Sequence, residues 1–197
     1  MSRLLVIGCG DVALRAAPWL RKKFRLFGLT RSVENFTSLR SHGITPILGD
    51  LDAPGSLLRL GGLAHYILHT APPPNTNKRD TRTRHLICAL NKGAILPQRV
   101  VYISTTGVYG DCAGANIDET RAVHPQTPRA QRRVDAEQCL RVWSMDNGIS
   151  LSILRAPGIY AADRLPLQRL QKQTPALNPA EDVFTNHIHA DDLARAC

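Results

Sequence analysis

Three small residues near the N-terminus have the spacing of a site for a diphosphate group. Gly8, Gly10 and Ala13 follow the apolar run Leu4-Leu5-Val6-Ile7 and form the pattern G-x-G-x-x-A. Gly8 permits a tight turn, and Gly10 leaves room for a pyrophosphate beside the main chain. The free N–H groups and the positive dipole end of a following helix would bind the phosphate oxygens. The alternative is an ordinary strand-turn-helix connection, but the position between a strand and a helix favours dinucleotide binding.

The predicted second strand ends in Thr30-Arg31-Ser32, where such a fold binds the adenosine ribose. A site for NAD commonly has an acidic residue at this position. The Arg31 guanidinium instead suits the 2′-phosphate of NADP and can stack on adenine. We therefore predict NADP as the preferred cofactor and NAD as the second choice. The alternative is that Arg31 is a solvated loop residue and that Glu34 binds the ribose.

Two further loops are candidates for cofactor contacts. Asp50 follows the predicted third strand, where its carboxylate can accept a hydrogen bond from the adenine amino group or cap the next helical segment. Thr70, Ala71 and Pro72 follow the predicted fourth strand and open a stiff proline loop. We expect this loop to lie beside the cofactor if the sheet is doubly wound.

Apolar strands alternate with helical segments along the chain. The predicted strands cover residues 4–7, 24–30, 45–48, 64–70, 99–104 and 150–155, and the predicted helices cover residues 11 to about 23, 33–41, 84–92 and 129–143. This alternation predicts an α/β fold, namely a Rossmann-type doubly wound parallel sheet with helices on both faces. A short strand at 186–189 precedes a last helix, which Asp191 and Asp192 would cap. We expect residues 1–160 to form an NAD(P)-binding domain.

Composition restricts the partners and the compartment that we expect. The net charge of +9 is compatible with nucleic-acid binding, but the basic residues are scattered and no helix-turn-helix or aromatic-rich strand accompanies them. No apolar run has the length of a membrane span, and no signal peptide is evident, so we predict no nucleic-acid or membrane partner and a cytoplasmic location. The five cysteines lack C-x-x-C spacing, and His187 and His189 have no evident third ligand. We therefore predict no metal site.

Five segments, taken in order, resemble one superfamily. They are residues 8–13, 49–52, 104–110, 155–160 and 187–194, and they span nearly the whole chain. The set is similar to the extended short-chain dehydrogenases/reductases of the NAD-dependent epimerase/dehydratase type, in particular to atypical nucleoside-diphosphate-sugar epimerase-like members. Together with the loops described above, this resemblance gives the following predicted cofactor contacts: Gly8, Cys9, Gly10, Asp11, Val12, Thr30, Arg31, Ser32, Asp50, Leu51, Thr70, Ala71, Pro72, Ser104, Pro157, Gly158 and Ile159.

The resemblance also implies positions for catalytic residues. In such enzymes a serine or threonine before the V-Y-G turn bonds the substrate oxygen, and this position is Thr105. A tyrosine on the next helix carries the proton, and a lysine four residues later lowers its pKa and holds the ribose. With Glu137 setting the register of Y-x-x-x-K-x-x-x-E, these positions fall on Arg129 and Arg133. An arginine stays protonated, so it can stabilise an oxyanion, hold a phosphate or contact the ribose, but it cannot replace the proton transfer.

Two tyrosines are candidates for the missing proton carrier. Tyr109 is close to Thr105 in sequence, and Tyr160 follows the predicted sixth strand; for both, packing beneath the cofactor loops is the alternative. Family members usually continue well beyond this length. We therefore expect residues 161–197 to be the start of a truncated or reduced substrate-side segment, with residues 161–182 facing the substrate. The predicted helices at 84–92 and 129–143 would be the surface of a homodimer in the family.

These observations lead to one leading function and two alternatives. The leading prediction is an NADP-dependent oxidoreductase or epimerase-like enzyme that acts on an unknown small carbonyl or sugar-type substrate. The first alternative is a non-catalytic NADP-binding sensor, because Arg129 and Arg133 occupy the tyrosine and lysine positions. The second is a nucleic-acid-binding protein, which has only the positive charge in its favour.

Overall fold

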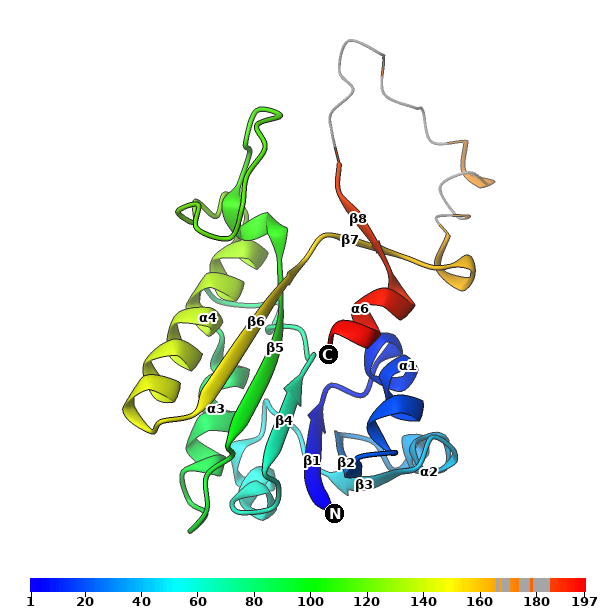
Figure 1. Cartoon of the computed structure of the whole chain (residues 1–197), viewed down its shortest axis with the longest axis vertical. Helices are drawn as coiled ribbons and strands as arrows, with labels where there is room; N and C mark the ends of the chain where they lie inside the picture. The colour runs from blue at the N-terminus through cyan, green and yellow to red at the C-terminus, as the bar shows by residue number, and fades with distance from the viewer. Residues whose placement is uncertain (166, 168–170, 174–177, 179–184) are drawn as a thin grey trace.

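A parallel six-stranded sheet forms the centre of the protein, which we describe from a computed structural model of residues 1–197. The structure describes residues 1–165, 167, 171–173, 178 and 185–197. The strand order is β3-β2-β1-β4-β5-β6, so the direction of winding reverses between β1 and β4 (Figure 1). This confirms the predicted Rossmann-type doubly wound sheet. The strands are β1 (Ser2–Ile7), β2 (Phe24–Thr30), β3 (Ile44–Leu48), β4 (Tyr66–His69), β5 (Arg99–Thr105) and β6 (Ser150–Ala156).

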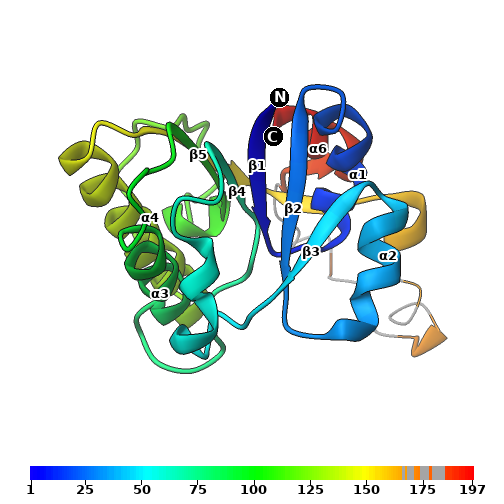
Figure 2. The ribbon, with the colours of Figure 1, turned by 90° about the horizontal axis from the view of Figure 1, so that it is seen from below.

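Helices cover both faces of this sheet (Figure 2). Alternate residues of β1 point to opposite faces: Leu5 and Ile7 pack in the cluster that contains Leu86 and Leu140 of α3 and α4, whereas Leu4 packs with Ala13 of α1. Because β1 is buried on both faces, it has the continuous apolar sequence of a central parallel strand. The helices are α1 (Asp11–Leu20), α2 (Phe36–Ser41), α3 (Thr81–Leu90), α4 (Pro128–Asp146) and α6 (Ala190–Ala196), and the short 3-10 helices are η1 (Val33–Asn35), η2 (Pro54–Leu60), η3 (Thr106–Tyr109) and η4 (Ala162–Arg164).

The C-terminal part lies beyond the carboxyl ends of the sheet strands and returns to α1 (Figure 1). Two short parallel strands, β7 (Gly158–Tyr160) and β8 (His187–His189), pair with each other. Helix α6 then packs on α1, where Leu193 and Ala194 join a cluster with Val12 and Ala16. The sheet and the C-terminal helix therefore hold α1 from two sides.

Capping residues explain where the observed helices differ from the predicted ones. Helix α3 begins at Thr81 because the Asp80 side chain accepts a hydrogen bond from Thr83 N at 3.2 Å, and α4 begins at Pro128 because Thr127 Oγ1 accepts one from Ala130 N at 3.2 Å.

Asp11 at the start of α1, and Asp191 and Asp192 at the start of α6, are the acidic residues that the sequence offers as helix caps, but none of them is the N-cap. Gly10 is the N-cap of α1 and makes no side-chain bond there, whereas α6 is capped by His189, whose Nδ1 accepts a hydrogen bond from Asp191 N at 3.2 Å. The aspartates at these helix starts take part in ion pairs instead.

None of the helices in the described part of the chain is long and apolar enough to cross a membrane.

Candidate active site

A cavity of about 890 Å³ lies at the carboxyl ends of the sheet strands, and each of the strands β1 to β6 contributes its last residues or the loop that follows it. This is where open α/β sheets bind their ligands, and the volume lies within the range of small-molecule sites. Ser32 and Gly158 are absent from its lining: the Ser32 hydroxyl accepts a hydrogen bond from Glu34 N at 3.3 Å, and Gly158 lies against His187. The other predicted cofactor contacts all line the cavity, namely Gly8, Cys9, Gly10, Asp11, Val12, Thr30, Arg31, Asp50, Leu51, Thr70, Ala71, Pro72, Ser104, Pro157 and Ile159.

The two positions after β1, Gly8 and Gly10, are glycine for different structural reasons. Gly8 has a φ of 92°, and a Cβ atom there would lie 2.4 Å from the backbone nitrogen of Ala71, so a side chain would clash with the loop after β4. Gly10 has no atom within 4 Å of the position that a Cβ would take. The space beside Gly10 is therefore open for a phosphate group, and Asp11 and Val12 place the first turn of α1 in the cavity lining.

Cys9, between these glycines, is a packing residue. Its Sγ lies 3.8 Å from Val6 O and 3.7 Å from Leu29 O. Burial raises the pKa of its thiol to about 12, because a low-dielectric environment disfavours the thiolate. The thiol is therefore neutral and unreactive at physiological pH.

At the adenosine end, Arg31 lines the cavity with an exposed side chain that has no recorded hydrogen bond or ion pair among the described residues, although its charge contributes to lowering the pKa of Asp52. Glu34, the alternative ribose ligand, does not line the cavity. The Asp50 carboxylate accepts a hydrogen bond from Asp52 N at 2.9 Å, and the N-cap of η2 is Ala53, so Asp50 stabilises a turn and does not cap that helix.

Arg82 is a cavity residue that the sequence analysis missed. It lies at the start of α3 and pairs with Asp52 at 2.6 Å, across 30 residues of chain. No local pattern signals such a pairing.

Three of the four predicted catalytic residues meet in the cavity. Thr105 lies at the end of β5, and its Oγ1 accepts a hydrogen bond from Gly107 N at 3.2 Å. Arg129 is exposed in the first turn of α4, and Arg133 is buried one turn later. Because residues four apart lie on the same helix face, both arginines present this face to the cavity.

The fourth predicted catalytic residue, Tyr109, does not line the cavity. Its side chain is 6% exposed, and its hydroxyl accepts a hydrogen bond from Arg155 Nη1 at 2.8 Å, with the guanidinium 4.8 Å from the ring centroid. Tyr160 is half exposed and packs edge-on against His187 and His189, also outside the cavity lining. Neither position supports a role in proton transfer, and packing is the role that the structure gives to both tyrosines.

A buried polar network anchors α4 against the sheet. Arg155 Nη2 on β6 pairs with Glu137 Oε2 on α4 at 2.7 Å, and the Ser104 hydroxyl donates to Glu137 Oε1 at 2.5 Å. Glu137 is 3% exposed, so this carboxylate depends on both partners. Although Ser104 lines the cavity, its hydroxyl is engaged by Glu137.

Arg133 has an unusual environment for a buried cation. Its Nη1 donates to Tyr102 Oη at 2.9 Å and to Ile103 O at 2.7 Å, and its Nε is buried with no partner. Burial raises the pKa of Tyr102 to about 12, so this phenol is neutral. Burial and then the charge of Arg133 lower the pKa of His69 to about 3, so this imidazole is neutral as well. Sequence reasoning assigned Arg133 to the lysine position but had no signal for this environment.

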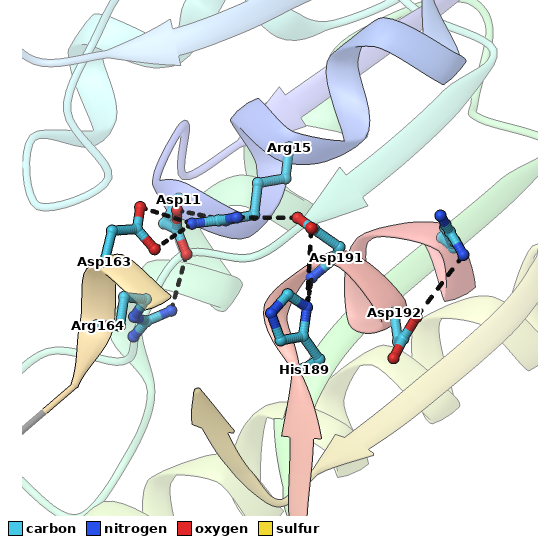
Figure 3. Close-up of polar contacts among 8 residues, drawn as sticks. Asp11, Arg15, Asp163, Arg164, His189, Asp191 and Asp192 are labelled. Atoms are coloured by element: carbon cyan, nitrogen blue, oxygen red, sulfur yellow. Dashed lines mark hydrogen bonds and ion pairs between the residues drawn. The ribbon is translucent and has the colours of Figure 1, made fainter. Parts of the chain in front are cut away.

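A second arginine cluster lies where η4 and α6 meet α1 (Figure 3). Arg15 bonds Asp11 at 2.8 Å, Asp163 at 2.6 Å and Asp191 at 2.9 Å, and Arg164 bonds Asp11 at 3.0 Å. Arg164 also lines the cavity. The sequence analysis missed this cluster because its bonded partners lie up to 176 residues apart in the chain.

Residues 161–165, 167, 171–173 and 178 are the described part of the predicted substrate segment 161–182, and the rest of it lies outside the described residues. Among the described residues, no group of three or more histidine, cysteine or acidic side chains has the arrangement of a metal site.

Solved structures similar to this chain share its fold over nearly its whole length. A Methylobacillus flagellatus protein assigned as an NAD-dependent epimerase/dehydratase is 28% identical, with a TM-score of 0.76 over 98% of this chain and 67% of that protein. A Silicibacter pomeroyi protein of unknown function is 25% identical, with a TM-score of 0.70 over 99% and 66%. This chain thus spans about two thirds of the length of these structures.

A more distant structure has bound ligands. UDP-glucuronic acid 4-epimerase from Bacillus cereus, in complex with UDP-glucuronic acid and NAD, is 20% identical, with a TM-score of 0.77 over 98% of this chain and 71% of that one. At this identity the likeness shows the fold alone. A comparison with curated proteins finds no match. The model of the NAD-dependent epimerase/dehydratase family matches residues 16–197, and with the NAD-binding fold described above, the chain belongs to this family.

Proposed function

We propose that this chain binds NADP, with NAD as the second choice, and acts as an oxidoreductase or epimerase-like enzyme on a small carbonyl or sugar-type substrate. The observation that carries the proposal is that Gly8 and Gly10 of the glycine turn line the same cavity as Thr105 at the end of β5. The Bacillus cereus epimerase, which shares this fold and was solved with NAD, supports the choice of a nicotinamide cofactor.

The residues of the cavity fit such a cofactor. The open space at Gly10 and the first turn of α1 suit the pyrophosphate, and the exposed Arg31 guanidinium suits a 2′-phosphate. When bound, a nicotinamide dinucleotide would supply a hydride donor or acceptor. Arg164, which bonds Asp11 beside this turn, is within the same lining and would add positive charge near the phosphates.

Thr105 is the residue that we expect to act on the substrate oxygen. Its Oγ1 accepts a hydrogen bond from Gly107 N, so its hydroxyl hydrogen is free to donate to a carbonyl oxygen and polarise it. A guanidinium group has no proton-accepting atom, so neither Arg129 nor Arg133 can act as the proton carrier. Since Tyr109 does not line the cavity, we infer that water in the cavity carries the proton to and from the substrate oxygen.

Fluorescence titration with NADPH and NADH, followed by turnover assays on a panel of aldehydes, ketones and nucleotide sugars, tests this function. We expect binding and turnover in the wild type, and Thr105→Val should lower kcat by roughly 100-fold without changing cofactor affinity, because it removes one hydrogen bond to the reacting oxygen. Cofactor binding without turnover on the whole panel would contradict the enzymatic role and favour the NADP-binding sensor.

Arg31→Glu tests the choice between NADP and NAD. We expect the affinity for NADPH to fall roughly 100-fold, because a charge-assisted hydrogen bond is replaced by a repulsion, whereas the affinity for NADH changes by less than about threefold. Arg59→Glu is the matched control, because Arg59 is exposed on η2 and outside the cavity lining. Equal losses for both cofactors would remove Arg31 from the 2′-phosphate.

A further inference from the structure

We propose that Arg129 and Arg133 bind a carboxylate or phosphate group of the substrate, beside the Thr105 hydroxyl. The proposal rests on the proposed function, because it names the substrate class for the same cavity: small carbonyl compounds that carry an anionic group. It departs from the tyrosine and lysine pattern of the family and rests on the charges that this chain places there.

The two arginines are placed to act on one ligand. They lie four residues apart on α4 and both line the cavity that Thr105 also lines. The helix begins at Pro128, so its positive dipole end lies at Arg129 and adds to the potential. A guanidinium presents planar paired donors that match a carboxylate or phosphate.

Arg133 makes no ion pair or hydrogen bond with a described carboxylate. It is 6% exposed, its recorded hydrogen bonds go to a phenol and to the backbone oxygens of Ala71 and Ile103, and its Nε has no partner. Glu137, the carboxylate one turn along α4, is bound by Arg155 and Ser104. A buried charge without a counter-charge is costly, so a bound anion would relieve this cost. Neutral ribose hydroxyls would supply hydrogen-bond acceptors but no counter-charge.

Arg129 is equally free of carboxylates within the described part of the chain. It is exposed and has no recorded hydrogen bond or ion pair. The acidic residues of the cavity lining do not compensate it: Asp11 is bound by Arg15 and Arg164, and Asp50 accepts a hydrogen bond in its own turn beyond β3. The end of the cavity near α4 is therefore cationic.

Ligand-observed NMR titrations with two pairs of probes test this proposal, with and without NADPH. Pyruvate is compared with acetone for the carboxylate, and dihydroxyacetone phosphate is compared with dihydroxyacetone for the phosphate. We expect at least one anionic probe to bind at least tenfold more tightly than its neutral counterpart, and the pair that shows the difference identifies the group. Arg129→Gln and Arg133→Met should each remove at least tenfold of that anion affinity and leave the neutral probe unchanged.

Arg141→Gln is the matched control, because Arg141 is exposed on the same helix and outside the cavity lining. If Arg133→Met does not fold, Arg129→Gln decides the outcome, since Arg129 is exposed and its replacement leaves the core intact. Equal affinities within both pairs, or anion binding that survives Arg129→Gln, would overturn the proposal. NADPH titration of the same samples separates the proposed function from the anion site. Anion binding without NADPH binding would contradict only the proposed function. NADPH binding without anion binding would contradict only the anion site.

Discussion

Arg15 and Arg133 show two different uses of the same side chain. Arg15 is bonded to three carboxylates, Asp11, Asp163 and Asp191, which come from α1, η4 and α6 (Figure 3). Arg133 is more deeply buried, yet its recorded partners are all neutral. The more accessible cation, Arg15, is thus paired with carboxylates, whereas the less accessible cation, Arg133, has only neutral hydrogen-bond partners.

The difference separates a structural charge from one that is available to a ligand. The Arg15 cluster joins elements that are distant in sequence, and its contribution is an attachment between α1 and the C-terminal part. No described carboxylate is hydrogen-bonded or ion-paired to Arg133, so its charge is available to a bound anion. Each prediction below tests one side of this contrast, beginning with the largest effect.

Arg155→Met is expected to have the largest effect on stability. It would leave Glu137, which is 3% exposed, without its counter-charge, so the free energy of unfolding should fall by about 3–5 kcal/mol in urea denaturation. The double variant Arg155→Met/Glu137→Leu should recover most of this loss, because it removes the buried carboxylate as well. An unchanged free energy of unfolding in Arg155→Met would show that a buried charge on α4 needs no partner, which would contradict the contrast drawn with Arg133.

The pH dependence of the free energy of unfolding is expected to report on the charge of Arg133, because this charge contributes to lowering the pKa of the buried His69. Burial and then Arg133 lower the folded-state pKa of His69 to about 3, so between pH 3 and the unfolded value near 6.5 the unfolded chain binds more protons. Stability contributed by His69 is therefore present above pH 6.5 and is lost as the pH falls. Compared with His69→Gln, the wild type should lose about 2 kcal/mol more between pH 7 and pH 5.

Arg133→Met should weaken that pH dependence, because removing the nearby cation raises the folded-state pKa of His69 toward its ordinary value. Urea denaturation of the wild type and both variants at each pH measures the effect. A pH dependence identical in Arg133→Met and the wild type would mean that the charge of Arg133 is not felt in the core.

Arg15→Met is expected to have the smallest effect. The cluster is accessible to solvent, so its loss should lower Tm by a few degrees, and the difference from the wild type should shrink in high salt because the ion pairs are screened. Cofactor affinity should change by less than about twofold, since Arg15 does not line the cavity. Arg15→Lys keeps the charge but loses the planar donors, so its Tm should lie between those of the wild type and Arg15→Met. A loss of anion-probe binding in Arg15→Met would contradict the purely structural role given to Arg15 and the ligand-binding role given to Arg133.

Local sequence patterns determined much of the fold and the dinucleotide end of the cavity. The apolar runs and their alternation with helical segments predicted the parallel sheet, because a strand buried on both faces must be apolar throughout. The glycine at position 8 was predictable because the positive φ of a tight turn is a property of a short segment, whereas its close approach to Ala71 depends on the tertiary structure. The family pattern set Arg129 and Arg133 in the register of the catalytic helix, and both line the cavity.

Tertiary structure alone decided how the charged and hydroxyl groups are used. Tyr109 is a candidate proton carrier by sequence, but the structure packs it against Arg155, which is 46 residues away in sequence, and outside the cavity lining. The three carboxylates of Arg15 and the neutral surroundings of Arg133 depend likewise on segments far apart in the chain. The strength and the role of a charge depend on its burial and its neighbours, and a sequence pattern records neither of them.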